Sequence, residues 1–259
     1  MPETTTKLAE TVSVRPAASR AELEDSFRLV YRSYLQRGYV VPSPTEIRLG
    51  LHNILPAAAT FVGIIEDTVI ATVSLVPDSP MGLPMDGIYH DEADELRQQG
   101  RRLTEVTMLA DRRMEIKRTL PMLLSLMKLV FDYAQLVLKA NDLCITINPR
   151  HAAFYERYLL FEDLGPERSY DTVQGHPALA KRLNLDTVRE ACRDHGLLLR
   201  IFFEDRTPIH VFQSRYAMSC EDVEYFYVKL TSTLRHAEAE HVNFLRTQRP
   251  DCAWDRWLS

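Results

Sequence analysis

Three neighbouring runs of the sequence indicate the fold of this chain: RRLTEVTMLA (residues 101–110), LPMLLSLMKLVFDYAQLVL (120–138) and LCITIN (143–148). The first and third runs are short and apolar, and Pro149 closes the third, which is typical of buried strands. The middle run has nearly the length of a membrane span, but polar residues recur three or four positions apart and form one stripe: Ser125, Lys128, Asp132, Gln135 and Lys139. The order predicts a strand, a soluble helix with a broad apolar face, and a second strand.

The flanking segments extend this pattern. Ser19, with Glu22 three residues later, predicts a capping box before a helix that ends near Gly38. The other expected elements are strands at 12–15, 60–65, 69–76 and 159–164 and helices at 91–99 and 152–158. We therefore expect an α/β (α+β) domain over residues 12–184, with a mixed central β-sheet flanked by helices, behind a flexible start at 1–11.

The pattern changes after residue 184. Residues 185–195 have helical spacing, 197–203 (LLLRIFF) resemble a strand, and Ser219 would cap a long helix over 219–246. No low-complexity linker separates this part from the first. We expect residues 185–259 to form a mainly helical C-terminal extension packed on the domain.

Composition excludes several functions. The 259 residues are 46% hydrophobic, and 31 Lys+Arg against 36 Asp+Glu give a net charge of -5, so a nucleic-acid surface is not expected. The 9 glycines include no G-x-G-x-x-G or Walker motif. The cysteines are far apart, and residues 1–14 (MPETTTKLAETVSV) have neither a basic n-region nor an apolar h-region, which predicts reduced thiols and a cytoplasmic protein without a transmembrane segment. No pattern of metal ligands occurs, so no metal is expected.

Five ordered blocks carry a family resemblance: FRLVYRSYLQRGYV (27–40), RLGLHNILPAAATFVG (48–63), SLVPDSPMGLPMDGIY (74–89), GRRLTEVTMLA (100–110) and NPRHAAFYERYLLFEDLG (148–165). Together they resemble the long-chain N-acyl amino acid synthases of the GNAT acyltransferase superfamily, which are similar to autoinducer (N-acyl-homoserine lactone) synthases. The resemblance implies direct transfer of a medium or long acyl chain from an acyl carrier protein to an amino acid. It implies no permanently bound cofactor, because the donor itself carries 4'-phosphopantetheine.

Three residues are candidates for proton transfer. Glu105 lies in the predicted strand 102–110, where burial would raise the pKa of its carboxyl, and it matches the glutamate of the equivalent strand in autoinducer synthases. The alternative is a salt-bridged glutamate at a strand end. Glu24 is a second candidate, unless it pairs with Arg28 four residues later. Tyr155 matches the superfamily position near the leaving thiol, although it equally suits the core.

Arginine suits the acceptor carboxylate because its planar fork makes two parallel hydrogen bonds. The candidates are Arg28, Arg48 and Arg102, with Tyr31 and Tyr34 on the first helix as further substrate contacts. Surface or structural ion pairs are the alternative for the three arginines.

The segment DRRMEIKRT (111–119) bears on the donor. Superfamily members that use acetyl-CoA have a glycine-containing turn here, whose backbone N–H groups hold pyrophosphate. This chain has no glycine in the segment and instead has four cations: Arg112, Arg113, Lys117 and Arg118. We expect them to bind an acidic acyl carrier protein and its phosphopantetheine, unless they are a solvated charge run.

The expected acyl-chain pocket consists of Met81, Met85, Leu123, Leu124, Met127 and Phe131, all of which also suit an ordinary core. Two other functions stay open: an acyltransferase that uses acyl-CoA or makes a homoserine lactone, and a non-catalytic protein that binds lipid or acyl carrier on the same fold.

Overall fold

The computed structural model describes residues 12–112 and 116–258, without the side chains of 116–119. Its sheet has the order β1-β2-β3-β4-β5-β8-β6, with β7 paired to β8, and only β4 and β5 run parallel. The strands are β1 Ser13–Pro16, β2 Ala59–Ile65, β3 Thr68–Pro77, β4 Leu103–Asp111, β5 Asp142–Ile147, β6 Glu162–Asp163, β7 Arg168–Tyr170 and β8 His176–Asn184. The expected mixed sheet is confirmed.

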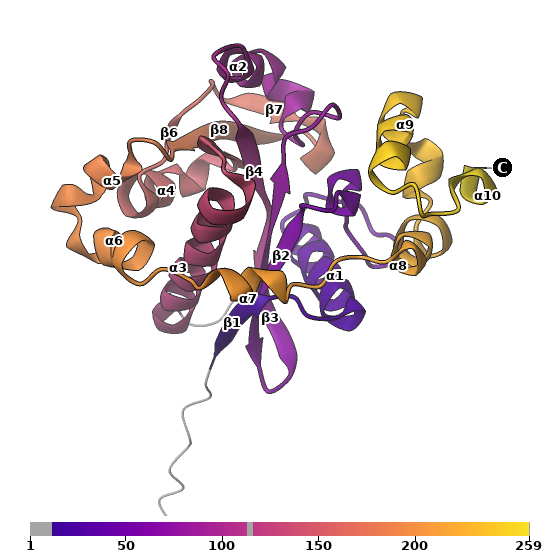
Figure 1. Cartoon of the computed structure of the whole chain (residues 1–259), viewed down its shortest axis with the longest axis horizontal. Coiled ribbons are helices and arrows are strands. Elements are labelled where there is room, and N and C mark those ends of the chain that lie inside the picture. Colours follow the sequence, from indigo (N-terminus) through magenta and orange to yellow (C-terminus); the bar gives the residue numbers. More distant parts are fainter. Residues whose placement is uncertain (1–11, 113–115, 259) are drawn as a thin grey trace, which may run out of the picture.

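Helices cover both faces of this sheet (Figure 1). The first part of the chain supplies α1 Arg20–Gln36, α2 Asp86–Gln98, α3 Ile116–Tyr133 and α4 Ala152–Leu159. The helix α1 begins where predicted, because the Ser19 side chain accepts a hydrogen bond from Glu22 N. Glu22 also pairs with Arg15 at 2.8 Å, which ties the start of α1 to β1. The predicted helix at 91–99 begins earlier, at Asp86.

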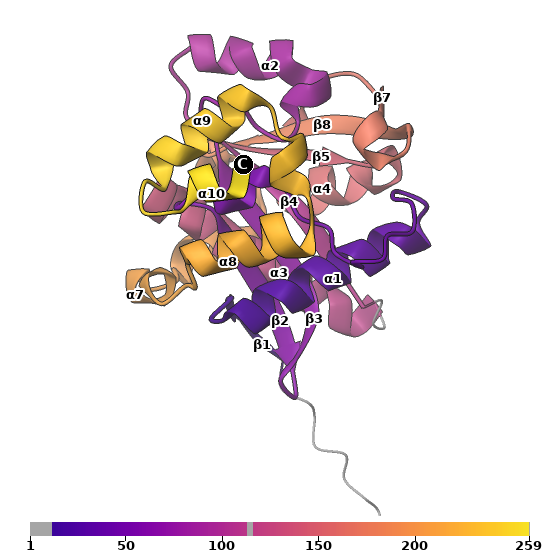
Figure 2. The same ribbon diagram turned by 90° about the vertical axis from the view of Figure 1, so that its right-hand side faces the viewer.

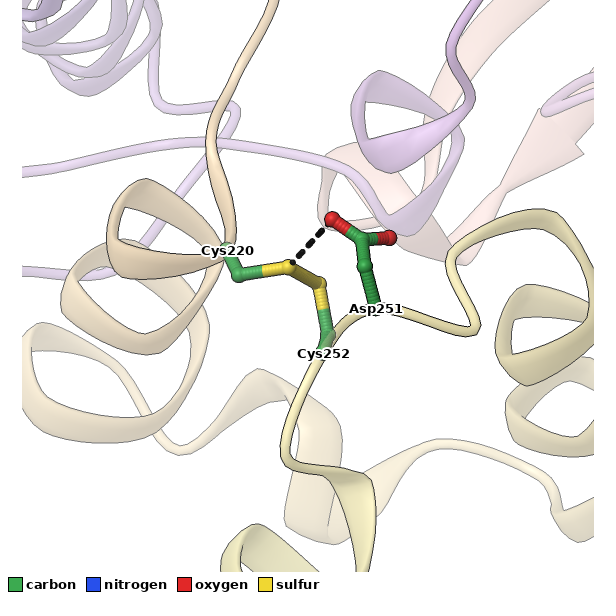
Figure 3. Close-up of side chains that lie close together, drawn as sticks. All are labelled: Cys220, Asp251 and Cys252. Carbon is green, nitrogen blue, oxygen red and sulfur yellow. Dashed lines mark hydrogen bonds between the residues drawn. A yellow bond between two sulfur atoms is a disulfide. The ribbon is translucent and has the colours of Figure 1, made fainter.

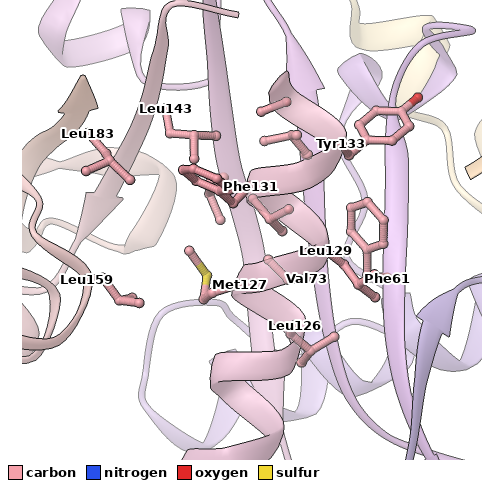
Figure 4. Close-up of a cluster of buried hydrophobic side chains, with 14 of the residues drawn as sticks. Phe61, Val73, Leu126, Met127, Leu129, Phe131, Tyr133, Leu143, Leu159 and Leu183 are labelled. Carbon is pink, nitrogen blue, oxygen red and sulfur yellow. The ribbon is translucent and has the colours of Figure 1, made fainter. Parts of the chain in front are cut away.

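The helix α3 packs its apolar side on the sheet (Figure 4). Leu126, Val130 and Phe131 are at most 1% exposed and contact the cluster that contains Phe61 and Val73. The run Leu120–Leu138 is long and apolar enough to cross a membrane, but half of its window is buried inside the protein. Length and composition are therefore weak evidence for a span here, and the run serves as a core helix.

The chain after Asn184 passes from one face of the sheet to the other (Figures 1 and 2). Its helices are α5 Val188–Ala191, α6 Gly196–Leu199, α7 Ile209–Gln213, α8 Cys220–Glu224, α9 Ala239–Gln248 and α10 Trp254–Leu258. Phe202 stacks on Phe131 of α3, with the ring centroids 4.7 Å apart. On the opposite face, Phe226 meets Phe27 of α1 edge to face at 5.4 Å. Two of the three hydrophobic clusters of the described residues therefore include this C-terminal part.

Two predictions for this part are wrong. Residues 197–203 are not a strand but α6 and the π-helical turn Arg200–Glu204, because Leu198 and Phe202 bury one helical face while Leu197 is 63% exposed. The expected long helix over 219–246 is broken into α8, the π-helical turn Tyr225–Leu230, the 3-10 helix Thr233–His236 and α9. Only its Ser219 cap is confirmed.

Strand β8 was not predicted, although it lies inside the sheet between β5 and β6. Its sequence HPALAKRLN contains a proline and two cations, which obscure the apolar alternation. Lys181 is nevertheless fully buried, because its Nζ pairs with Glu156 at 2.6 Å and with Asp163 at 2.5 Å.

The expectation of four reduced thiols is wrong. Cys220 at the start of α8 and Cys252 before α10 form a disulfide, and Asp251 Oδ2 lies 3.0 Å from Cys220 Sγ (Figure 3). The two cysteines are 32 residues apart, so their spacing gave no sign of the bond. Cys144 and Cys192 are free and buried. The cytoplasmic expectation therefore loses its support from cysteine usage.

Candidate active site

The site begins where β4 and β5 separate. Their parallel pairing runs only from Leu103 to Val106 on β4. Further along, β4 pairs with β3 at Thr107 and again at Ala110, so Met108 and Leu109 form a bulge in which Met108 has φ +55°. A cavity of about 1150 Å³ opens beside this bulge. The volume exceeds the roughly 300–1,000 Å³ of an ordinary small-ligand pocket, which leaves room for a long chain and a second molecule.

The cavity lining has an apolar and a polar part. The apolar part comes from the bulge and from α3: Met108, Leu109, Leu120, Met122, Leu123 and Leu126. The polar part comes from α1, the segment 48–53, the start of α4 and the strands β7 and β8: Tyr34, Arg37, Tyr39, Arg48, His52, His151, Tyr155, Tyr170 and His176. This division fits an amphipathic ligand or a pair of ligands.

Glu105 lines the cavity and is only 3% exposed. Its Oε2 accepts a hydrogen bond of 2.8 Å from the backbone N–H of Met85. Burial raises the pKa of the carboxyl to about 8; the Met85 bond opposes this and the charge of Asp86 adds to it. Among the described residues no cation pairs with Glu105, so the alternative of a salt-bridged glutamate does not hold within that part of the chain.

Three tyrosines accompany Glu105. Burial raises the pKa of Tyr34, Tyr155 and Tyr170, so each keeps its proton at neutral pH. The Tyr170 hydroxyl donates to Pro84 O at 2.8 Å. The Tyr155 hydroxyl has no hydrogen-bond partner among the described residues, which leaves it available to a ligand. Tyr170 lies on the unpredicted strand β7, so sequence reasoning missed it.

Only one of the three expected arginines lines the cavity. Arg48 lies over the Tyr34 ring, 5.3 Å from its centroid, and donates to Thr172 O at 3.2 Å. Arg28 instead pairs with Glu24 at 2.7 Å and donates to Thr45 O, and Arg102 is exposed at the start of β4. Arg37, which was not predicted, lines the cavity and donates to Ser33 O at 2.9 Å.

Glu24 and Tyr31 also lie outside the cavity lining. Besides its ion pair with Arg28, Glu24 accepts a hydrogen bond from Tyr225 at 3.1 Å. The Tyr31 hydroxyl is bonded to the backbone of Ser43. The helical spacing of Glu24 and Arg28 had already allowed the local ion pair that forms.

The expected acyl pocket is mostly core. Leu123 lines the cavity, whereas Leu124, Met127 and Phe131 pack in the cluster between α3 and the sheet. Met81 and Met85 are buried in two other clusters. The residues of α3 that sequence reasoning missed, Leu120, Met122 and Leu126, follow a helical spacing that could have identified them together with Leu123.

Part of the basic segment lies outside the described residues. Arg112 is exposed at the end of β4, and its backbone N–H donates to Ile70 O. Arg113 and the side chains of Lys117 and Arg118 are not described.

Two residues of the cavity lining each have a buried polar atom without a hydrogen-bond partner among the described residues. These atoms are His52 Nε2 and Thr146 Oγ1. Burial lowers the pKa of His52, so its ring is neutral at pH 7. Buried polar atoms are nearly always bonded, so these two are exceptions within the described part of the chain. His52 lies inside the block RLGLHNILP, in which the sequence analysis proposed a site role only for Arg48.

Known proteins resemble this chain in sequence and in fold. The structure of FeeM, an N-acyl amino acid synthase from uncultured soil microbes, matches with a TM-score of 0.63 at 29% identity, over 71% of this chain and 95% of that chain. BjaI, a CoA-dependent acyl-homoserine lactone synthase solved with SAM and isopentyl-CoA, matches with a TM-score of 0.54 at 14% identity, over 80% and 99%. The second likeness concerns the fold alone. No curated protein sequence matches.

The family profile of the N-acyl amino acid synthase FeeM matches residues 25–184, which is more than half of the chain. That range includes every residue of the cavity lining. The resemblance to N-acyl amino acid synthases carried by the five sequence blocks is thereby confirmed. The chain belongs to the FeeM family of N-acyl amino acid synthases and is an acyltransferase.

Proposed function

We propose that this protein transfers a medium or long fatty acyl chain from an acyl carrier protein to the α-amine of an amino acid, by direct attack on the thioester. The observation that carries the proposal is Glu105, a buried carboxyl with no cation partner among the described residues, in the wall of a large cavity that also has an apolar side. Its pKa of about 8 suits the removal of a proton from an ammonium group near neutral pH.

The reaction balances with the residues present. Glu105 takes one proton from the acceptor ammonium and releases it to solvent, and the free amine attacks the thioester carbonyl. The N–C bond forms, the carbonyl oxygen becomes an oxyanion, and the C–S bond then breaks. The Tyr155 hydroxyl gives its proton to the leaving thiolate and takes the second nitrogen proton in return, so Tyr155 ends the step protonated, as burial of its hydroxyl favours. Backbone N–H groups at the Met108–Leu109 bulge are the candidate oxyanion donors.

Arg48 is the candidate for the acceptor carboxylate. It lines the cavity, its guanidinium is positioned by Tyr34 and Thr172, and it has no carboxylate partner among the described residues. A planar guanidinium can bind a carboxylate through two hydrogen bonds. The α3 side chains Leu120, Met122, Leu123 and Leu126 would contact the acyl chain.

The carrier-protein donor is proposed from the sequence of residues 111–119, which has cations and no glycine. Without glycines the backbone is less suited to enclosing the pyrophosphate of CoA, whereas clustered cations attract an acidic carrier helix. Arg112 is the member of the cluster whose exposure the structure describes.

The test uses purified full-length protein, a mixture of amino acids, and hexadecanoyl thioesters of acyl carrier protein and of CoA in parallel. We expect thiol release and an N-acyl amino acid by mass spectrometry, with the carrier thioester preferred. Turnover with the CoA thioester but not with the carrier thioester would contradict the proposed donor, while the proposed acyl transfer to an amino acid would still hold. No thiol and no amide with either donor would contradict the enzyme proposal.

Glu105→Gln separates an enzyme from a non-catalytic binding protein, because it keeps the volume and removes the base. We expect the variant to bind the acyl carrier thioester as wild type does and to lose turnover. Glu162→Gln, an exposed change on β6, is the matched control. Full turnover in Glu105→Gln would show that another group takes the proton.

A further inference from the structure

The start of α2 holds the Glu105 carboxylate in place. Met85 is the residue that precedes α2, and its backbone N–H donates to Glu105 Oε2 at 2.8 Å. Met85 and Glu105 lie on different elements, 20 residues apart. The position of the carboxylate therefore depends on what fixes residues 78–86, a loop that crosses the end of the sheet where β4 begins (Figure 1).

A single arginine fixes both ends of that loop. Arg97, near the end of α2, donates to Asp78 Oδ2 through Nε at 2.7 Å and to Asp78 Oδ1 through Nη2 at 2.8 Å. The same Nη2 donates to Asp86 Oδ2 at 2.7 Å, and Nη1 donates to Asp94 at 2.7 Å. Asp78 is the first residue after β3, and Asp86 is the first residue of α2, directly after Met85.

The loop 78–86 packs closely around the ion pairs of Arg97. The side chains of Arg97, Asp78 and Asp86 are 23%, 19% and 18% exposed, so their ion pairs are shielded more than surface pairs. Gly82 has φ +69°, and a Cβ at this position would lie 2.3 Å from Asp86 Oδ2. The loop therefore approaches Asp86 as closely as a glycine allows. A planar guanidinium with its fixed fork can bridge three carboxylates in a way that lysine cannot.

We propose that Arg97 is a positioning residue for the Glu105 carboxylate: by bridging Asp78 and Asp86 it fixes the Met85 N–H that binds Glu105, and it offsets the negative charge beside it. The inference rests on the proposed role of Glu105 as base. Neither Arg97 nor its three partners lines the cavity, so Arg97 acts through Met85 and Asp86 rather than on the substrate.

Removal of the Arg97 charge is expected to raise the pKa of Glu105. Asp78, Asp86 and Asp94 contribute three negative charges and Arg97 one positive charge, so the cluster has a net charge of -2. Without Arg97 it has -3, and the added negative charge raises the pKa of Glu105 further. Tyr34 of α1, Tyr170 of β7 and Cys144 of β5 also face Glu105, and burial keeps these three groups neutral.

The experiment measures kcat/KM against pH from 6 to 10 for wild type, Arg97→Gln, Arg97→Lys and the double variant Arg97→Gln/Asp86→Asn. Activity should rise with pH as Glu105 loses its proton. In Arg97→Gln we expect this rise to move upward by roughly 0.5 to 1 pH unit. The double variant restores the net charge of -2 and should bring the rise back toward its wild-type position, but not fully, because the Met85 N–H that lowers the pKa of Glu105 is still not fixed. Its maximal rate should stay low. Arg97→Lys should keep the position of the rise and lose rate.

Arg168→Gln is the matched control, because Arg168 also anchors α2, through Glu92 at 2.6 Å, but does not contact Asp86. It should not move the pH profile. A purely structural role for Arg97 would lower the rate at every pH with an unmoved rise, and that result overturns the inference. If Glu105→Gln retains turnover, the proposed base itself is wrong; if it abolishes turnover while Arg97→Gln leaves the profile unmoved, only the inference fails.

Discussion

Residues 25–184 and residues 185–258 play different parts in this molecule. Every residue that lines the cavity lies in the first region, which the FeeM profile matches, and none lies in the second. The second region nevertheless supports the cavity wall from behind, since Tyr227 donates to Gly50 O at 3.0 Å and Gly50 lines the cavity. The cavity to which we assign the chemistry therefore belongs to the first region, and the second region contacts its wall from behind.

The largest expected effect is on chemistry in the first region. Glu105→Gln should lower kcat by about 10²- to 10⁴-fold, the usual contribution of a general base. In wild type, kcat/KM should fall as the pH drops through about 8, because the protonated carboxyl cannot accept a proton. A pH-rate profile for both proteins checks this. An equally large loss of kcat in a folded variant of residues 185–258 would contradict the assignment of the chemistry to residues 25–184.

The next effect tests whether the second region folds together with the first. Phe226 is fully buried against Phe27, so Phe226→Ala should cost about 3–5 kcal/mol of unfolding free energy. Both tryptophans, Trp254 and Trp257, lie in the second region, so their fluorescence reports on it alone. Urea unfolding followed by fluorescence and by circular dichroism should give coincident transitions in wild type. An earlier fluorescence transition would show that residues 185–259 are a separate subdomain.

The disulfide comes third. It closes a loop of 32 residues, and the double variant Cys220→Ser/Cys252→Ser should lose roughly 2–4 kcal/mol, because the unfolded chain gains freedom. Urea unfolding with and without a reducing agent checks this: reduction should destabilise wild type and leave the double variant unchanged. Since neither cysteine lines the cavity, kcat should be kept at low temperature. A loss of kcat in a folded double variant would show that the disulfide contributes to catalysis.

The smallest effect concerns the contact between the regions. Tyr227→Phe removes one hydrogen bond, worth about 1 kcal/mol, and should raise the KM for the amino acid more than it changes kcat, because Gly50 belongs to the polar wall near Arg48. Tyr225→Phe is the control, since its hydroxyl bonds to Glu24, outside the cavity lining. The same rise of KM in both variants would mean that the C-terminal region acts through stability alone.

The residues predicted for the site divide by the kind of signal that identified them. Glu105 was found because a carboxyl inside an apolar strand is unusual, and it lines the cavity. Arg28 and Glu24 were chosen by type and spacing, and the structure uses them in a local ion pair. His52, Arg37 and Tyr170 were missed because each lies on a segment whose position relative to β4 no local pattern specifies.

The sequence by itself determined the strand–helix–strand unit around residues 101–148, the capped first helix and the burial of Glu105, because these follow from hydrophobic periodicity and capping within short windows. Tertiary structure decided the rest. Packing against α3 made 197–203 helical, the two salt bridges of Lys181 allowed β8 to enter the sheet, and the approach of α8 to the loop before α10 joined Cys220 to Cys252. Each of these features depends on contacts between residues far apart in the chain, and such contacts cannot be predicted from short windows of sequence.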